Sequence, residues 1–166
     1  QFGRNHVGGM LMYMQRDYKK GVLPNRNQGF SGRFTYDFDH RYLAEFNFGY
    51  NGTERLPKGD RFEFFPAISL GWVISNENFF ESARETVDNL KLRASYGLVG
   101  SDQFHKDAPH FLYRDEVKLS DIGFTAGADW NNTKKGPNIT AYQVLNPRWE
   151  RSKKLDIGID ATLFRD

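Results

Sequence analysis

The sequence predicts an all-β protein of about six antiparallel strands. Apolar and polar side chains alternate with a period of two in six stretches, the charged residues of the clear stretches share one face, and aromatic residues make up 16% of the chain. A period of two is the pattern of strands whose two faces meet different surroundings. Aromatic side chains are favoured in strands because they pack well on a pleated surface.

The clearest pair of predicted strands covers residues 30–38 and 42–50. Only Asp39, His40 and Arg41 separate them, so we expect a hairpin with a tight turn. This short link keeps the apolar faces of both strands on the same side of the sheet. The shared apolar face carries Phe30, Gly32, Phe34, Tyr36, Phe38, Tyr42, Ala44, Phe46, Phe48 and Tyr50.

Four more strands are predicted at residues 6–16, 66–75, 90–99 and 154–163. In the first of these both faces are rather apolar, and we assign Val7 and Leu11 to the apolar side. Long polar links follow the first, third and fifth strands, and the last of these links, residues 100–151, is much the longest. The other links are compact, with a short helical turn expected near residues 79–87. The long links therefore gather at one end of the sheet.

The composition excludes several classes of protein. A net charge of +2 with interleaved signs gives no basic stripe, so no nucleic-acid partner is expected. The absence of Cys excludes disulfides, Cys zinc sites and thiol catalysis. No stretch approaches the 18 apolar residues of a membrane helix. Because both ends of the chain interrupt strand-like sequence, and no signal peptide begins it, we expect a fragment of a longer protein.

The five clear strands carry charges on only one face. This asymmetry fits a soluble β-sandwich, in which the charged face meets water, and equally an outer-membrane barrel, in which it lines the lumen. Strands of nine or ten residues, Tyr and Phe near the strand ends, and the division into short and long links are typical of the barrel. The eight charges, which the barrel interpretation makes lumen-facing, are Arg33, Asp37, Glu45, Lys91, Arg93, Lys154, Asp156 and Asp160.

Several stretches resemble a known family. The run RFTYDFDHRYLAEFNFGYNGTE resembles a central hairpin of the SusC/RagA-type TonB-dependent transporters of Bacteroidota outer membranes. FFPAISLGWVIS and NLKLRASYGLVGSD resemble the next two strands of that barrel, and LNPRWERSKKLDIGID resembles the strand after a long loop. HVGGMLMYMQRDY is also similar to one of its strands, whereas nothing specific is recognised in residues 102–142.

The resemblance implies about six strands from the C-terminal half of a 22-stranded transmembrane barrel. The plug domain and the TonB box of such transporters are absent from this sequence. The family imports large nutrients, glycans or peptides, across the bacterial outer membrane, with a SusD-like surface lipoprotein as lid and the TonB complex as energy source. The resemblance also implies that outer-membrane lipid surrounds the barrel wall. A soluble carbohydrate-binding β-sandwich remains the alternative.

No catalytic signature or cofactor motif is found, so the chain is expected to be neither an enzyme nor a cofactor protein. His105 and His110, with Asp102 and Asp107, could form a metal site, but a solvated loop without metal is the favoured interpretation. Asp156 and Asp160 lie two pleats apart, about 13 Å along a strand, which is too far for a catalytic carboxylate pair. An enzymatic domain that uses the acidic loop residues is the weakest hypothesis.

The long link carries aromatic residues among polar ones, a combination that suits sugar rings or peptide side chains. These residues could instead form a small core within the loop or contact the lid protein, and we favour these two roles over direct substrate contact. Phe104 and Trp149 also lie in this link. The candidate residues for contact with substrate or lid are Phe111, Tyr113, Phe124, Trp130 and Tyr142.

Overall fold

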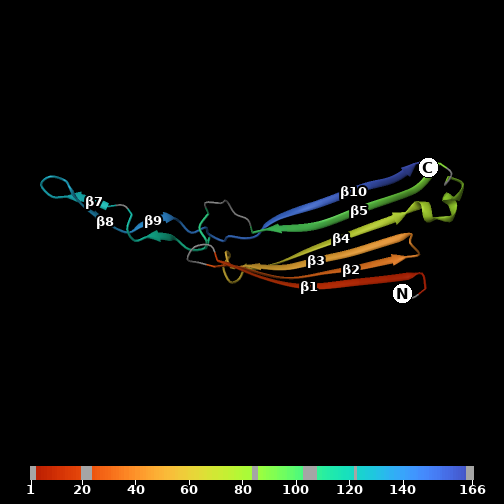
Figure 1. Ribbon diagram of the computed structural model, residues 1–166, viewed down its shortest axis with the longest axis horizontal. Helices are drawn as coiled ribbons and strands as arrows, with labels where there is room; N and C mark the ends of the chain where they lie inside the picture. Colours follow the sequence, from red (N-terminus) through yellow and green to blue (C-terminus); the bar gives the residue numbers. More distant parts are fainter. Residues whose placement is uncertain (1–2, 20–23, 84–85, 103–107, 122, 164–166) are drawn as a thin grey trace.

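In the computed structural model, six long strands form one antiparallel sheet in the order β1-β2-β3-β4-β5-β10 (Figure 1). The structure describes residues 3–19, 24–83, 86–102, 108–121 and 123–163. The strands of the sheet are β1 (Asn5–Lys19), β2 (Pro24–Phe38), β3 (Tyr42–Thr53), β4 (Phe62–Val73), β5 (Val87–Ser101) and β10 (Glu150–Leu163). The prediction of an all-β fold with six antiparallel strands is confirmed.

The strands are longer than the alternating stretches that predicted them. β1, β2 and β5 each have 15 residues. β1 and β2 continue mainly toward the long links, at the end of the sheet drawn on the left of Figure 1, and β5 is longer at both ends. Backbone hydrogen bonds hold a ladder together whatever the side chains are. The alternation therefore ends where both faces become polar, although the ladder goes on.

The tight turn between β2 and β3 forms as the short link requires. The Arg41 backbone N–H donates to the Phe38 carbonyl at 3.0 Å, and Asp39 and His40 both have φ of 54°. Positive φ at both central residues is the mark of a type I′ hairpin turn. The Asp37 carboxylate accepts a hydrogen bond from the His40 backbone N–H at 2.8 Å, which offsets part of the strain.

The predicted strand at residues 66–75 is wrong at its C-terminal end. β4 stops at Val73, whose N–H donates to the Arg41 carbonyl at 2.7 Å, and a 3₁₀ helix, η1, follows at Ile74–Asn76. The neighbouring strand β3 begins only at Tyr42, so residue 74 has no ladder partner there. Ser75 turns inward and bonds the Asn89 side chain. A second 3₁₀ helix, η2, spans Asn78–Ala83.

The long link is more ordered than the sequence suggested. It contains two nested two-stranded ladders, one between β6 and β9 and one between β7 and β8. Together they form an arm that projects away from the sheet at the long-link end, whereas the first and last described residues lie at the opposite end (Figure 1). The arm strands are β6 (Glu116–Lys118), β7 (Gly123–Ala126), β8 (Asn132–Lys135) and β9 (Asn138–Ala141).

The sheet has no second layer among the described residues. Apolar side chains on it stay open: Val7 is 74% exposed, Leu70 55% and Ile157 77%. A soluble sandwich would cover this face with another sheet. The buried hydrophobic side chains of the described residues form one small cluster, the loop-base core, at the root of the arm: Leu56, Phe65, Leu112 and Trp149.

Glycines at the root of the arm allow close packing, and this gives a test of the loop-base core. A Cβ at Gly100 would overlap the ring of Phe65, whereas a Cβ at Gly59 would meet nothing within 4 Å. We expect Gly100→Ala to lower the free energy of unfolding by about 1–3 kcal/mol, because the ring must shift. The control Gly59→Ala should be neutral or stabilising by about 0.4–1 kcal/mol.

The measurement is the thermal midpoint of the complete protein in detergent, followed by the gel mobility of folded and unfolded forms. Equal midpoints for the two variants would contradict the packing of Gly100 against Phe65.

Candidate functional site: two unlike faces and an outer arm

The register of the ladders puts the eight charged residues on one face, here called the charged face. Arg33 lies opposite Asn47, one pleat from Glu45, and Lys91 lies opposite Asp160. The Arg33 guanidinium is 3.4 Å from the Glu45 carboxylate and donates to the Asn47 side chain at 3.0 Å.

Arg93 lies 3.4 Å from Asp160, the residue that faces Lys91 in the register. The central strand β4 contributes only small residues at this level, Ser69 and Gly71. As a result, a shallow cavity of about 450 Å³ separates Glu45 from the basic residues of β5. The charged face thus has acidic and basic walls around an uncharged floor.

The opposite face, the apolar face, is bounded by two aromatic rows. The outer row, nearer the arm, contains Tyr13, Phe30, Tyr50 and Phe64, which are successive register partners. The inner row, at the tight turns, contains Phe38, Tyr42 and Trp72, with neighbouring ring centroids 6.3 and 6.5 Å apart. Phe30 and Phe38 lie about 26 Å apart along the strand, which at a tilt of about 40° covers about 20 Å of an apolar band about 25 Å tall.

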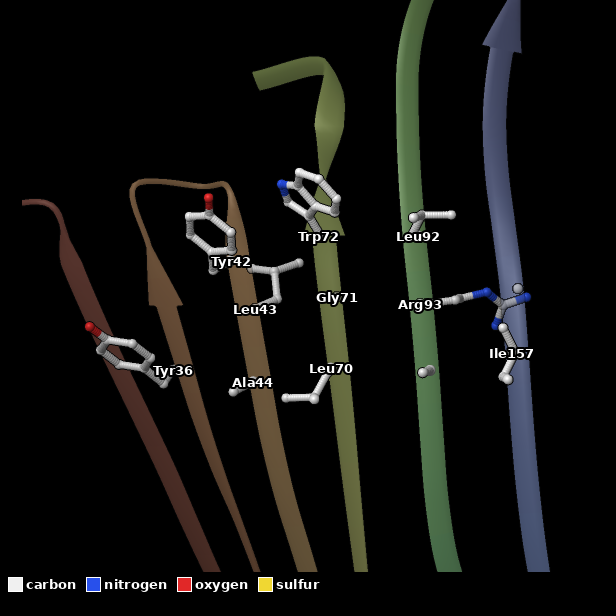
Figure 2. Close-up of a pocket in the computed structure, with 12 residues that line it drawn as sticks. Tyr36, Tyr42, Leu43, Ala44, Leu70, Gly71, Trp72, Leu92, Arg93 and Ile157 are labelled. Carbon is white, nitrogen blue, oxygen red and sulfur yellow. The ribbon is translucent and has the colours of Figure 1, made fainter. Parts of the chain in front are cut away.

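A shallow cavity of about 650 Å³ lies on the apolar face beside the inner row. Figure 2 shows its cause: Ala44 and Leu70 occupy the level directly below the rings of Tyr42 and Trp72. Register pairing continues this level from Leu70 to Ala94. The small side chains of Ala44 and Ala94 lie between larger neighbours, so the cavity is a shallow groove in an exposed surface.

At the tight-turn end, Glu77 gathers three hydrogen-bond donors. The Tyr42 hydroxyl and the Trp72 indole N–H donate to Glu77 Oε1 at 2.7 and 3.1 Å, and an Arg41 guanidinium nitrogen lies 3.3 Å from Oε2. The bonds from Tyr42 and Trp72 lower the pKa of Glu77 below its usual value, and Arg41 adds to the effect. The carboxylate thereby joins β3, β4 and the link after η1.

At the other end, polar contacts hold the root of the arm beside the loop-base core. His110 Nε2 lies 3.3 Å from Glu54 Oε1, and both side chains are about four-fifths buried. The Asn27 amide donates to Asp102 at 2.8 Å, and the Trp149 indole N–H donates to the Arg61 carbonyl at 3.1 Å. The arm therefore leaves the sheet from a fixed base.

The structure divides the five candidate contact residues into two groups. Phe111 and Tyr113 lie near the base, with ring centroids 5.8 Å apart and the Arg114 guanidinium 5.6 Å from each ring. Phe124 and Trp130 lie out on the arm and are 68% and 75% exposed. Tyr142 is 75% exposed but lies nearer the base, two residues before Val144, whose N–H donates to the Leu112 carbonyl. The five do not form one site. Trp149, by contrast, is buried in the loop-base core.

A metal site in this region finds no support in the described residues. Asp102 accepts a hydrogen bond from Asn27, and His110 faces Glu54. No group of three or more His, Asp or Glu side chains that could hold a metal ion occurs in the part of the chain that the structure describes. Phe104, His105 and Asp107 lie outside the described residues.

Sequence reasoning missed the residues that organise the two ends. Leu56 is an isolated apolar residue in a polar segment, and Leu112 lies between two aromatic residues in a link without a period. Glu77 lies between the two 3₁₀ helices, and no pattern marks it. One available signal was Trp72, five residues before Glu77, together with Trp149 itself, since buried rings with N–H groups require acceptors.

Comparisons with known proteins agree with this geometry. No family model matches the chain. TonB-dependent receptor P26 of Formosa agariphila is 29% identical over 167 aligned positions, which cover 96% of this chain and 16% of the relative. TonB-dependent receptor SusC of Bacteroides thetaiotaomicron is 28% identical over 78% of this chain and 12% of its own length. In the described part of the chain, no helix is long and apolar enough to cross a membrane.

A solved structure, "Structure of the RagAB peptide transporter", superposes with a TM-score of 0.75 at 18% identity, covering 98% of this chain and 20% of the other. This likeness concerns the fold. This segment belongs to the SusC/RagA-type TonB-dependent transporters. It spans between 12% and 16% of the length of the curated relatives that it matches.

Membership of a SusC/RagA-type barrel explains why the sheet is single and amphipathic. Both β1 and β10 are paired on one side only, as strands are where a larger barrel continues. The predicted fold class, antiparallel strands from such a barrel, is confirmed. The relatives are named as receptors and transporters, and none of these names denotes an enzyme.

The Glu77 contacts predict a pH-dependent joint at the tight-turn end. The folded-state pKa of Glu77 lies below its unfolded value, so its stabilising effect is present at neutral pH and is lost as the pH falls through the folded pKa. In the complete transporter we expect Glu77→Ala to lower the thermal midpoint more than Glu77→Gln, since the amide oxygen still accepts one bond.

Both differences from the native protein should shrink in acidic buffer, where the native carboxylate is protonated. Thermal midpoints measured at a series of pH values provide the check, and a constant difference at all pH values would refute the role of the carboxylate.

Proposed function

We propose that the complete protein carries out TonB-dependent transport across the bacterial outer membrane. Its cargo would be large nutrients, either oligosaccharides or peptides. This segment forms part of the barrel wall and of the extracellular loops. The observation that carries the proposal is the separation of the two faces, with ion pairs such as Arg93–Asp160 on one and open apolar side chains on the other. Lipid on the outside and water on the inside would satisfy both faces of a single sheet.

The names of the relatives support the same activity. SusC and the Formosa receptors are named TonB-dependent, and the protein of similar fold is named a peptide transporter. By analogy, the partners of the complete protein are a SusD-like surface lipoprotein and, through a segment outside this chain, the TonB complex. No enzymatic step and no cofactor are required. The charged face, from Arg33 to Asp160, would then line the transport passage.

The arm supplies the proposed contact surface outside the membrane. Trp130 and Tyr142 expose their rings at different levels of the arm, and the loop-base core and the Glu54–His110 pair support the arm at its root. Exposed aromatic residues are frequent energetic centres of protein interfaces. We therefore assign the arm first to contact with the surface lipoprotein, and direct contact with substrate is secondary.

No observation favours the soluble β-sandwich. A sandwich needs a second sheet on the apolar face, and the two small ladders of the described chain project beyond the end of the sheet (Figure 1).

Lysine substitutions on adjacent residues of β4 test the orientation of the wall. Ile68 lies on the apolar face midway between the aromatic rows, and Ser69 lies on the charged face. In the complete transporter we expect Ile68→Lys to destabilise the barrel by about 2–4 kcal/mol, because the ammonium group would enter lipid. Ser69→Lys should leave folding unchanged. The measurement is the amount of heat-modifiable folded barrel in outer membranes.

Equal assembly of both lysine variants would contradict the proposed orientation of β4 in the membrane. If both assemble normally and the transporter is extracted without detergent, the soluble interpretation would replace it.

Alanine substitutions on the arm test its partner. In cells that carry the complete transporter, Trp130→Ala with Tyr142→Ala should reduce co-purification of the surface lipoprotein at least about tenfold, since an exposed interface ring often contributes about 2 kcal/mol. Phe79→Ala is the matched control, because Phe79 is 67% exposed at the opposite end of the sheet. Unchanged capture together with weaker substrate binding would reassign these rings to the substrate.

A further inference from the structure

A small polar cavity lies at the outer edge of the apolar face, one register step beyond the outer aromatic row. Its volume is about 230 Å³. Gln15 faces Gln28, Gln28 faces Gly52, and Gly52 faces Phe62, so these four residues form one row across β1 to β4. The row adjoins Tyr13, Phe30, Tyr50 and Phe64 of the outer aromatic row.

Glycine and an aromatic ring shape the cavity. Gly52 is buried and contributes no side chain, and a Cβ there would overlap the ring of Phe62. The Phe62 ring in turn stacks on Tyr50, with centroids 5.3 Å apart and planes 19° from parallel. The cavity therefore has a flat aromatic wall that begins within the apolar surface below it.

Polar groups line the remaining sides and are held in place. The Tyr13 hydroxyl donates to Gln15 Oε1 at 3.1 Å, which orients the Gln15 amide nitrogen as a donor for a ligand. Arg26 is held by Asp17, 3.1 Å from its Nε, and its backbone N–H donates to Glu54 at 3.0 Å. Amides, a guanidinium and a carboxylate beside an aromatic face are the groups that bind sugar hydroxyls and sugar rings.

The charges around the cavity and its position on the sheet limit which ligands would fit. Arg26 and Arg61 are balanced by Glu54 and the adjoining Asp17, so the cavity suits the hydroxyl groups of sugars better than phosphate groups. The cavity opens on the apolar face, away from the charged face. A sugar bound here would have lipid directly below it, where Phe30 and the rest of the apolar face begin.

We propose that this cavity binds the saccharide headgroup of an outer-leaflet glycolipid whose acyl chains lie along the apolar face. The proposal rests on the proposed function, because it requires the apolar face to meet lipid. The amides of Gln15 and Gln28 donate to sugar hydroxyls, and the Phe62 ring packs against the apolar side of a sugar. A bound glycolipid would then stay attached to the lipid-facing surface of β1 to β4.

The test uses the complete transporter in nanodiscs of phosphatidylethanolamine that contain deep-rough lipopolysaccharide. Native mass spectrometry counts the lipopolysaccharide molecules retained per protein. We expect Gln15→Ala with Gln28→Ala to reduce retention at least about fivefold, since two hydrogen bonds to the sugar are lost. The single Gln28→Ala variant should give an intermediate loss. Folding of each variant is verified by its heat-modifiable gel band.

The matched control is Arg16→Ala with Asn25→Ala. These residues belong to the same two strands, but the register puts them on the charged face. The control should retain lipopolysaccharide like the native protein. Equal retention of lipopolysaccharide by all variants would overturn the proposal. The proposal would also fall if the free headgroup oligosaccharide, which has no acyl chains, bound as tightly as the glycolipid.

Nutrient uptake, measured in parallel, separates this proposal from the proposed function. A native transporter that imports but retains no lipopolysaccharide refutes only the glycolipid site. Failure of the native protein to import, with lipopolysaccharide still bound, refutes only the transport activity.

Discussion

The register of the antiparallel ladders is the constraint on which the rest of this structure depends. Side chains alternate across the pleat, so a slip of one residue in any strand would exchange its two faces. For β5 alone, a slip would carry Lys91 and Arg93 to the apolar face, at a cost of about 2–4 kcal/mol for each charge near the middle of a bilayer. The tight turn at Asp39 and His40 sets the register between β2 and β3, and backbone bonds extend it across the sheet.

The two ends of the sheet are stabilised by different physics. At the tight-turn end, Glu77 joins β3 and β4 through hydrogen bonds and pairs with Arg41. At the arm end, Leu56 and Leu112 of the links pack with Phe65 and Trp149 into a buried apolar cluster. A compact joint and a supported, projecting arm follow from these different contacts.

The same separation of faces connects the two proposals. The charged face is suited to a water-filled passage and the apolar face to lipid. The outer aromatic row marks the level at which the lipid surrounding gives way to polar groups such as Gln15 and Gln28. Contacts with nutrient, with surface protein and with membrane lipid are thereby directed to the passage, the arm and the outer wall respectively.

Some features of the site could be predicted from the sequence, and others could not. That Arg33, Glu45, Lys91 and Arg93 share a face followed from a period of two, because parity along a strand is a local property. That Arg93 pairs with Asp160 rather than Asp156 depends on how β5 and β10 align, and these strands are about 50 residues apart in the chain. The end of β4 at Val73 was missed for a similar reason, because it depends on where the neighbouring strand β3 begins.

By itself, the sequence determined the class of the fold, the two unlike faces and the end at which the long links gather, since each is written in local alternation and link length. Only the tertiary structure decided where Trp149 and Trp130 lie. Both are tryptophans in one long polar segment, yet Trp149 is buried against Phe65 and Trp130 is exposed on the arm. Burial of a loop side chain depends on which distant residues surround it, and no local period records that.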